Sequence, residues 1–587
     1  MADHHPLAIT DLVVRYYGRK DDALRGISLE AEAGTFTTIA GRNGAGKSTL
    51  ALAAAGLLPR VIRAMVSGRI EIAGEVILDE APGAPGAAPK PASSGNARSS
   101  ARAGIVFPNP GNQLSGTKTS VREELAFGLE NLGIPRDQMD GRIDRVLSDL
   151  QIEHLADRPP YALSGGEQQR VAIASIVAME LPLLVLDEPT AQLDPLATMT
   201  VAQLLERIAS EGVAVLAAEH APEVLGRSSR TLVLADGRAV TLDIPGRALA
   251  PEVLRDTGAE SPTVVALASA AGIPPEQAFD EQAIAIGLRS AARTRTLASL
   301  PPVGAATQID WEPVRSQPST GIEIRGLVHR YPGGVEALRG VDLSIEPGTS
   351  VAIVGQNGSG KTTLVKHLNG LLRPTSGSVR IGELDVASVP VHRAAATVGF
   401  VFQDPDDQLF SRTVSRELQF GPRNLRLSDD ATRALVAAAL RAIGLEAERD
   451  VNPYDLNVSA RKLIALGSVL ATDPAILVLD EPTTGQDAPG LERVGGIVDA
   501  FHAAGRTVVA ISHDMEFAAR HFGRIVVMRH GEVVADDEPG AIFAPERAEL
   551  LASTGLTPPP TARIAARLGI REVPAGWREL LALIESA

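Results

Sequence analysis

Cysteine, long apolar runs and excess positive charge are all missing from this sequence. The absence of cysteine among 587 residues excludes disulfides and Cys-ligated zinc, and suits a reducing compartment. No stretch reaches the roughly 18 to 20 apolar residues of a membrane span, since the nearest, at 171–186, is interrupted by Glu180 and Pro182. The N-terminus lacks the basic and apolar segments of a signal peptide. A formal net charge of -15 argues against non-specific binding of nucleic acid.

What the chain does contain is an internal duplication, and its length also points to more than one domain. The stretch "ALRGISLEAEAGTFTTIAGRNGAGKSTL" at 23–50 recurs as "ALRGVDLSIEPGTSVAIVGQNGSGKTTL" at 337–364. Likewise "LLVLDEPTAQLD" at 183–194 recurs as "ILVLDEPTTGQD" at 476–487. We therefore expect two domains of the same fold.

The ends and insertions of the halves set the predicted boundaries. Similar tails at 250–273 and 544–570 predict a short helical appendage after each half. The segment at 81–100 has no apolar residue larger than Ala besides Pro, which predicts a flexible surface loop. The expected order is a first domain at 1–245, a first appendage at 246–290, a linker at 291–318, a second domain at 319–540 and a second appendage at 541–587.

Each half contains a glycine-rich phosphate loop. "GRNGAGKST" at 41–49 and "GQNGSGKTT" at 355–363 both follow an apolar, strand-like run and precede a helical one. In such a loop backbone N–H groups surround phosphate oxygens, the lysine holds the outer phosphates, and the next hydroxyl binds Mg²⁺. The predicted ATP contacts are Gly41, Asn43, Gly44, Gly46, Lys47, Ser48 and Thr49 in the first half, and Gly355, Asn357, Gly358, Gly360, Lys361, Thr362 and Thr363 in the second.

Acidic pairs end the strand-like runs "LLVLD" and "ILVLD". We expect Asp187 and Asp480 to act on Mg²⁺ and ATP, with Ser48 and Thr362 as the hydroxyl ligands. The next residues, Glu188 and Glu481, are placed to polarise the attacking water. The alternative, a solvated acidic strand end, fits poorly with a buried strand that stops on "DE" before "PT".

A histidine and an aromatic residue also recur in both halves. His220 and His513 each follow a further apolar strand, and we expect them to contact the γ-phosphate, although a lone histidine at a strand end is more often structural. Tyr16 and Tyr331 precede the phosphate loops, where a ring can stack on adenine. The alternative for the tyrosines is a place on the surface of a strand.

The order of these motifs, with "LSGGEQQR" at 163–170, resembles the ATPase subunits of ABC transporters over 7–240 and 321–540. The segment "VGFVFQDPDDQLFSRTVSRELQFGPRNLRL" at 398–427 resembles the energy-coupling-factor group, which drives uptake of vitamins and metals, and 103–134 is its echo. The resemblance implies an α/β fold with two tandem P-loop ABC-type ATPase domains, each with a helical subdomain and a short helical C-terminal appendage.

The same resemblance implies cofactors, partners and a location. ATP and Mg²⁺ would be bound, with Gln403 acting on the metal or the water. One chain would supply both ATPase halves to a complex with integral membrane subunits, a coupling subunit and a substrate-binding subunit, at the cytoplasmic face of the membrane. The segments after Gln403 and around Pro108 would receive the partner's cytoplasmic helix.

Family mechanism also places each ATP between the phosphate loop of one half and the "LSGGE" segment of the other. Ser164, Gly165 and Gly166 are intact in the first half, but the second half reads "LNVSARKL" at 456–463. Pro108 stands where the second half has Gln403. Both losses fall on the composite site that contains Lys47, Asp187, Glu188 and His220. We therefore expect one hydrolytic site, built on Lys361, Gln403, Asp480, Glu481 and His513, and one site that mainly binds.

Other double ATPases are the competing interpretations. The fused ATPase of a sugar importer also has one impaired half, but "FQDPDDQLF" and the repeated tails favour the coupling-factor group. A translation-associated ATPase on ribosomes would have a basic helical linker and two intact signatures. A DNA-repair ATPase would have zinc cysteines or long coiled coils. The acidic, cysteine-free chain fits neither of these last two.

Overall fold

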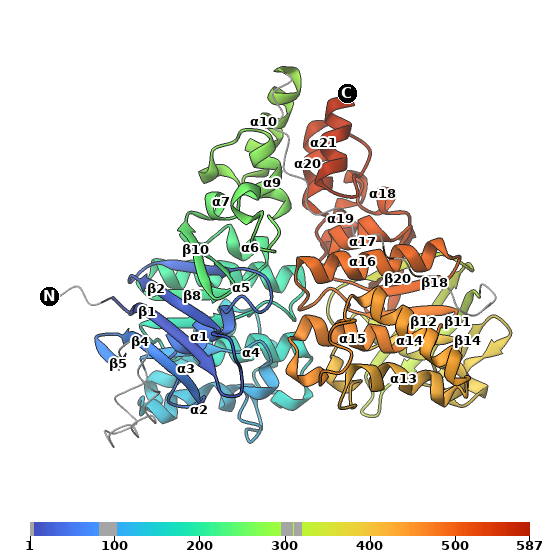
Figure 1. Cartoon of the computed structure of the whole chain (residues 1–587), viewed down its shortest axis with the longest axis horizontal. Coiled ribbons are helices and arrows are strands. Elements are labelled where there is room, and N and C mark those ends of the chain that lie inside the picture. Colours follow the sequence, from blue (N-terminus) through green and yellow to red (C-terminus); the bar gives the residue numbers. More distant parts are fainter. Residues whose placement is uncertain (1–4, 81–101, 295–308, 310, 312–319, 587) are drawn as a thin grey trace. The chain divides into compact units, whose positions relative to one another are not determined.

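The computed structural model describes residues 5–80, 102–294, 309, 311 and 320–586. The predicted loop at 81–100 and most of the predicted linker at 291–318 lie outside these residues. The described chain divides into two compact units (Figure 1). Unit 1 comprises Met1–Ser269 and Ile273–Phe279, and unit 2 comprises Ala270–Gly272 and Asp280–Ala587.

Unit 1 contains two sheets of different character. A four-stranded antiparallel sheet has the order β2-β1-β4-β5, and a six-stranded sheet has the order β10-β9-β3-β8-β7-β6, parallel except for the pair β9 and β10. Its strands are β1 (Leu7–Tyr16), β2 (Leu24–Ala31), β3 (Phe36–Ala40), β4 (Ala64–Ile72), β5 (Glu75–Glu80), β6 (Ala103–Val106), β7 (Leu183–Asp187), β8 (Ala214–Ala218), β9 (Arg230–Ala235) and β10 (Arg238–Asp243).

Helices cover both faces of the parallel sheet in unit 1. Strands β3, β7 and β8 are buried along their whole length, as expected for parallel strands covered on two sides. The helices are α1 (Lys47–Ala54), α2 (Val121–Leu132), α3 (Arg136–Asp149), α4 (Gly165–Val177), α5 (Pro195–Ser210), α6 (Pro222–Leu225), α7 (Pro245–Ala248), α8 (Pro251–Leu254) and α9 (Thr263–Ala270). Helices α2, α3 and α4 pack together as a helical subdomain.

Unit 2 repeats this plan, with sheet orders β12-β11-β14-β15 and β16-β17-β18-β13-β19-β20. Its strands are β11 (Ile322–Arg330), β12 (Glu336–Ile345), β13 (Ser350–Val354), β14 (Ser376–Ile381), β15 (Leu384–Asp385), β16 (Val398–Val401), β17 (Ile476–Asp480), β18 (Thr507–Ile511), β19 (Arg524–Arg529) and β20 (Glu532–Asp537). Its helices are α10 (Glu281–Thr294), α11 (Lys361–Leu368), α12 (Val391–Ala394), α13 (Val414–Asn424), α14 (Asp429–Ile443), α15 (Val458–Leu470), α16 (Ala488–Ala503), α17 (Met515–His521), α18 (Pro539–Ile542), α19 (Ala548–Ser553), α20 (Pro560–Leu568) and α21 (Trp577–Ser586). The predicted duplication of an α/β fold is confirmed.

The boundary between the units falls near residue 280, inside the segment expected as the first appendage. Helix α10 packs against α20 and α21 within unit 2. The Arg563 guanidinium lies 2.5 Å from a carboxylate oxygen of Glu281, and Arg289 donates to the backbone oxygen of Arg567 at 3.0 Å. Both tail segments thus contribute helices to one small cluster in unit 2.

No helix in the described ranges combines the length and the apolar character that are needed to cross a bilayer.

Candidate functional site

The phosphate loops join a buried strand to a helix in both units. Gly46 and Gly360 begin α1 and α11 with φ of 107° and 102°, a conformation that residues with a side chain rarely adopt. A Cβ at Gly46 would lie 2.8 Å from the Ala23 oxygen, and one at Gly360 would lie 2.6 Å from the Ala337 oxygen. Glycine is therefore required here for both backbone angle and space. Gly41, Gly44, Gly355 and Gly358 also have positive φ.

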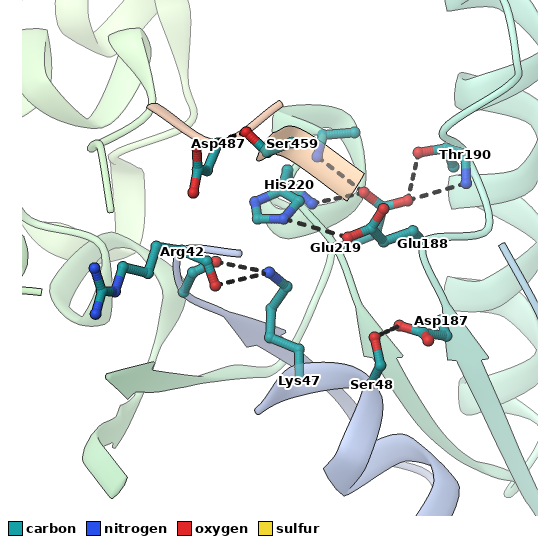
Figure 2. A network of polar contacts seen from close by, with 12 residues as sticks. Arg42, Lys47, Ser48, Asp187, Glu188, Thr190, Glu219, His220, Ser459 and Asp487 are labelled. Carbon is teal, nitrogen blue, oxygen red and sulfur yellow. Dashed lines mark hydrogen bonds and ion pairs between the residues drawn. The ribbon is translucent and has the colours of Figure 1, made fainter. Parts of the chain in front are cut away.

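The lysines of these loops fold back over the backbone. Lys47 Nζ donates to the oxygens of Gly41 at 2.8 Å and Arg42 at 3.2 Å (Figure 2). Lys361 Nζ makes the same two contacts in its own loop, at 2.7 and 2.8 Å. Both lysines are almost wholly buried, with 4% of Lys47 and 5% of Lys361 exposed. Each ammonium group is thus held where the outer phosphates of a nucleotide would meet it.

A hydroxyl and a carboxylate meet beside each loop, as the sequence predicts for a magnesium site. Ser48 Oγ donates to Asp187 Oδ1 at 3.0 Å (Figure 2). In unit 2 Thr362 Oγ1 donates to Asp480 Oδ1 at 3.3 Å. Burial, with the neighbouring glutamate as a further cause, raises the pKa of Asp187 and Asp480 to about 6. These hard oxygen ligands fit Mg²⁺, and a bound cation would offset the burial of the carboxylates.

The two candidate bases differ in their histidine partners. Glu188 and Glu481 both have left-handed backbone, with φ of 48° and 51°. His220 Nε2 lies 3.7 Å from Glu188 Oε1, and 44% of the His220 side chain is exposed. His513 Nε2 lies 3.0 Å from Glu481 Oε1, and only 15% of that side chain is exposed. Although burial alone would raise the pKa of either glutamate, its histidine and the loop lysine hold that pKa below the ordinary value.

The largest asymmetry lies at the loop after β6 and β16. Gln403 Nε2 donates to Glu481 Oε2 at 2.8 Å, so the amide reaches the candidate base directly. Pro108 at the matching place has no side-chain amide to offer. The loop itself keeps its shape, since Gln113 accepts from the Phe107 N–H at 3.0 Å just as Gln408 accepts from the Phe402 N–H at 3.2 Å.

In unit 1 the "LSGGE" segment forms the start of α4. Ser164 and Glu167 make a capping box in which each side chain accepts from the other's backbone N–H. A Cβ at Gly165 would lie 2.7 Å from Gln192 Oε1, so any side chain here would displace the end of the Gln192 side chain. Gly166 is buried in the same turn.

In unit 2 the matching segment begins α15 but presents different chemistry. Asn457 still caps the helix, because its side chain accepts from the Ala460 N–H at 2.8 Å. Val458 is 44% exposed where unit 1 has Gly165. Ser459 is buried and donates to Gln486 at 2.5 Å, with Asp487 at 3.2 Å (Figure 2). The changes at 457–459 therefore preserve the capped start of α15, but they replace the exposed glycine backbone of the signature with a valine side chain.

The two tyrosines lie against the phosphate-loop helices. Tyr16 Oη donates to Thr49 Oγ1 at 3.2 Å, and Tyr331 Oη pairs with Thr363 Oγ1 at 3.1 Å. Burial raises the pKa of the Tyr16 hydroxyl. Tyr331 is 37% exposed, which leaves ring surface available to a base. Asn43 and Asn357 lie half-buried in the loops.

Sequence reasoning missed two charged residues beside these groups. Lys462 replaces Gln169 of unit 1, and its Nζ donates to the Glu481 backbone oxygen at 3.3 Å. Glu219 replaces Ser512 of unit 2 and is buried next to His220. Aligning the two halves shows both substitutions, but only the structure shows that each side chain reaches the site of its own unit.

Comparisons with known proteins agree with this geometry. Residues 24–191 and 338–484 match the family described as "ABC transporter". A relative in Caldanaerobacter subterraneus subsp. tengcongensis, whose name assigns it as an ABC transporter ATP-binding protein, is 33% identical over 96% of each chain. One with a similar name in Streptomyces coelicolor is 34% identical over 92% of this chain and 96% of its own.

Among solved structures, one of cbiO1 from Clostridium perfringens, described as part of the ABC transporter complex cbiONQ, is 31% identical. It covers 42% of this chain and 98% of that chain, with a TM-score of 0.37. Two matches to one family model, one in each half, confirm the predicted pair of tandem P-loop ATPase domains. The chain belongs to the ABC transporter family of ATP-binding proteins, and its ATPase domains bind ATP and Mg²⁺ and hydrolyse ATP.

Proposed function

We propose that this chain energises a membrane uptake transporter of the energy-coupling-factor type, which carries a vitamin or a metal ion. The observation that carries this proposal is that the two units place different side chains around the candidate base, Glu481 in unit 2 and Glu188 in unit 1. In unit 2 Gln403 and His513 both contact Glu481, whereas unit 1 has Pro108 and a more exposed His220. Unit 2 would therefore supply the hydrolytic machinery, and unit 1 would mainly bind ATP.

The composite arrangement follows from the family mechanism. Lys361 and the loop of unit 2 would bind one ATP together with Ser164, Gly165 and Gly166 of unit 1. Lys47 and the loop of unit 1 would bind the other ATP with the altered segment 456–463. An exposed valine at 458 hinders the close approach of backbone N–H groups to a phosphate, which supports the assignment of this second site as degenerate.

In the proposed hydrolytic site each group has one task. Glu481 accepts a proton from the attacking water, and its lowered pKa keeps it ionised for that role. Gln403 orients the carboxylate or the water, and His513 contacts the γ-phosphate. Lys361 holds the outer phosphates, while Mg²⁺, held by Thr362 and Asp480, would neutralise charge on them.

Coupling to transport would occur through a membrane partner. ATP binding would bring the two domains together and hydrolysis would release them, a ligand-driven shift between two states. Phe410 and Phe420, which follow Gln403, are 59% and 50% exposed, and their rings meet edge to face at 4.7 Å. Exposed paired aromatics are common at protein interfaces, and this pair is suited to an apolar helix of the coupling subunit.

The rest of the assembly follows the same proposal. A separate substrate-binding membrane subunit would recognise the transported molecule, and one chain would supply both ATPase halves at the cytoplasmic face. The segment 398–427 supports the coupling-factor group over a sugar-importer ATPase. The net charge of -15 supports a membrane partner over ribosomal RNA.

The test is ATP turnover by the membrane-assembled complex with Glu481→Gln or Glu188→Gln. The proposal expects Glu481→Gln to abolish turnover and Glu188→Gln to leave most of it. Comparable losses in both variants would show that "LNVSARKL" still works as a signature, and the asymmetric assignment would then be wrong. Co-purification of membrane subunits, as opposed to ribosomes, tests the transport role separately.

A further inference from the structure

Glu219 links two turns of the unit 1 site that the sequence motifs treat as separate. It lies between the end of β8 and His220, and 3% of it is exposed. Its carboxylate accepts from the Thr190 N–H at 3.1 Å and from the Thr190 hydroxyl, and also from the N–H groups of His220 at 2.6 Å and Ala221 at 3.0 Å (Figure 2). We call these contacts the Glu219 bridge. It ties the turn that follows Glu188 to the turn that contains His220.

Unit 2 lacks this bridge at the matching place. Ser512 stands where unit 1 has Glu219, and its hydroxyl accepts from the Asp514 N–H at 3.0 Å, within its own turn. In the part of unit 2 that the structure describes, no side-chain hydrogen bond joins Ser512 to Thr483, the counterpart of Thr190. The turn that contains His513 is thus tied to the neighbouring strand end by the contact of His513 with Glu481 at 3.0 Å, and Ser512 adds no carboxylate to it.

The position of the histidine relative to its glutamate differs between the units, and the Glu219 bridge accounts for the difference. The Glu219 carboxylate accepts hydrogen bonds from the backbone N–H groups of both His220 and Ala221. These two bonds fix the direction of the backbone at His220. The His220 ring is the more exposed of the two and lies 0.7 Å farther from its glutamate, at 3.7 Å compared with 3.0 Å for His513. Charge-assisted hydrogen bonds of this kind are among the strongest that hold a turn in place.

Glu219 also changes the charge around unit 1's nucleotide position. The charge of Glu219 acts on Asp187 together with that of Glu188, whereas unit 2 has serine in place of Glu219. An added anion near a transferring phosphoryl group opposes the charge that develops in the transition state.

We propose that Glu219 is a positioning residue that holds the His220 turn in a geometry of slow turnover. This inference rests on the proposed function, in which unit 1 mainly binds ATP. It adds a residue of unit 1 itself that contributes to the difference in turnover between the two units. Unit 1 would then be slow for a reason beyond the loss of its glutamine and of the partner signature.

The experiment uses the full-length chain carrying Glu481→Gln, in which turnover by unit 2 is lost, so that any phosphate release above background reports unit 1. Adding Glu219→Ser, which installs the unit 2 residue, should raise kcat by about 10- to 100-fold, the rate change that corresponds to one charge-assisted hydrogen bond. Thr190→Val, which removes one partner at the other end of the bridge, should raise kcat in the same direction. A rise of this kind separates positioning from a structural role, because damage to the fold would lower turnover.

The controls fix what each result means. The added turnover must disappear when Glu188→Gln is combined with Glu481→Gln and Glu219→Ser, since it should run through Glu188. No rise in either bridge variant, while thermal stability and ATP binding stay intact, would overturn the inference. Equal losses from Glu188→Gln and Glu481→Gln as single variants would instead overturn the proposed function, whatever the bridge variants do.

Discussion

Lys462→Gln gives unit 2 the residue that unit 1 has at this place, and we expect it to slow ATP turnover. The Lys462 ammonium donates to the backbone oxygen of Glu481, a residue in left-handed backbone with φ of 51°. That conformation costs a residue with a side chain about 1 to 2 kcal/mol, so it persists only where neighbours hold it. The Glu481 N–H also donates to the Ile511 oxygen at 3.1 Å, which restrains the other side of the residue.

The size of the effect follows from that contact. A hydrogen bond from a charged donor contributes about 1.5 to 3 kcal/mol, and the Lys462 side chain is sufficiently desolvated for its pKa to fall to about 8. Loss of this hydrogen bond should let the Glu481 carboxylate move out of position, and kcat should then fall by about 10- to 100-fold. KM should change little, because the phosphate loop is untouched.

Steady-state phosphate release over a range of ATP concentrations measures this effect. Lys462→Arg should restore part of kcat, since it keeps a cation at the same place. Arg461→Gln is the matched control, because this neighbour pairs with Asp406 at 2.8 Å and should alter kcat less than about twofold. Wild-type kcat should also fall above about pH 8, where Lys462 loses its proton, in a step that Lys462→Gln lacks. A Lys462→Gln chain with normal kcat, or an equal loss in Arg461→Gln, would show that Lys462 does not position Glu481.

Other predictions test the signature, the metal site and the fold. Replacing residues 457–459 by Ser-Gly-Gly in a chain that carries Glu481→Gln should raise the remaining phosphate release about tenfold. No change would count against the assignment of a degenerate signature. Mg²⁺-dependent ATP binding, measured by calorimetry, should weaken as the pH falls through about 6, because burial raises the pKa of Asp187 and Asp480 and their protonated forms are poor ligands. Asp480→Asn should remove the part of this step that belongs to unit 2, and Asp187→Asn the part that belongs to unit 1. Asp473→Ala should lower the free energy of unfolding by about 3 to 5 kcal/mol, because it leaves the buried Arg506 without its carboxylate at 3.1 Å. The exposed Asp499→Ala is the control in the same thermal scan, and a loss below about 1 kcal/mol for Asp473→Ala would contradict the assignment.

The sequence carried the fold because its local signals are strong. Apolar runs that end on Asp187 and Asp480 became fully buried parallel strands, and the phosphate loops lie between strand and helix as their glycines predict. The hydroxyl and carboxylate pairs also meet, since the strand ends and the helix starts lie at one edge of a parallel sheet.

What the sequence did not reveal depends on the direction of side chains. The alignment of halves shows Lys462 opposite Gln169, but the helix period alone does not say that Nζ reaches Glu481. In the same way the sequence shows Glu219 only as one polar residue after a strand. The four hydrogen bonds that its carboxylate accepts come from Thr190, which is distant in sequence, and from His220 and Ala221 in its own turn. The repeated tails also gave no sign that α10 joins unit 2, because amphipathicity does not identify the partner of a helix.

The placement of α10 has a consequence for how the chain can be divided. A cut between 295 and 319 would separate the sequence into two polypeptides of similar length, yet α10 would stay with the N-terminal piece while its packing partners, α20 and α21, stay with the C-terminal piece. The salt bridge of Glu281 with Arg563 and the apolar face of α10 would then act as a non-covalent clasp. Two polypeptides divided at that point would share this cluster of helices, one supplying α10 and the other α20 and α21.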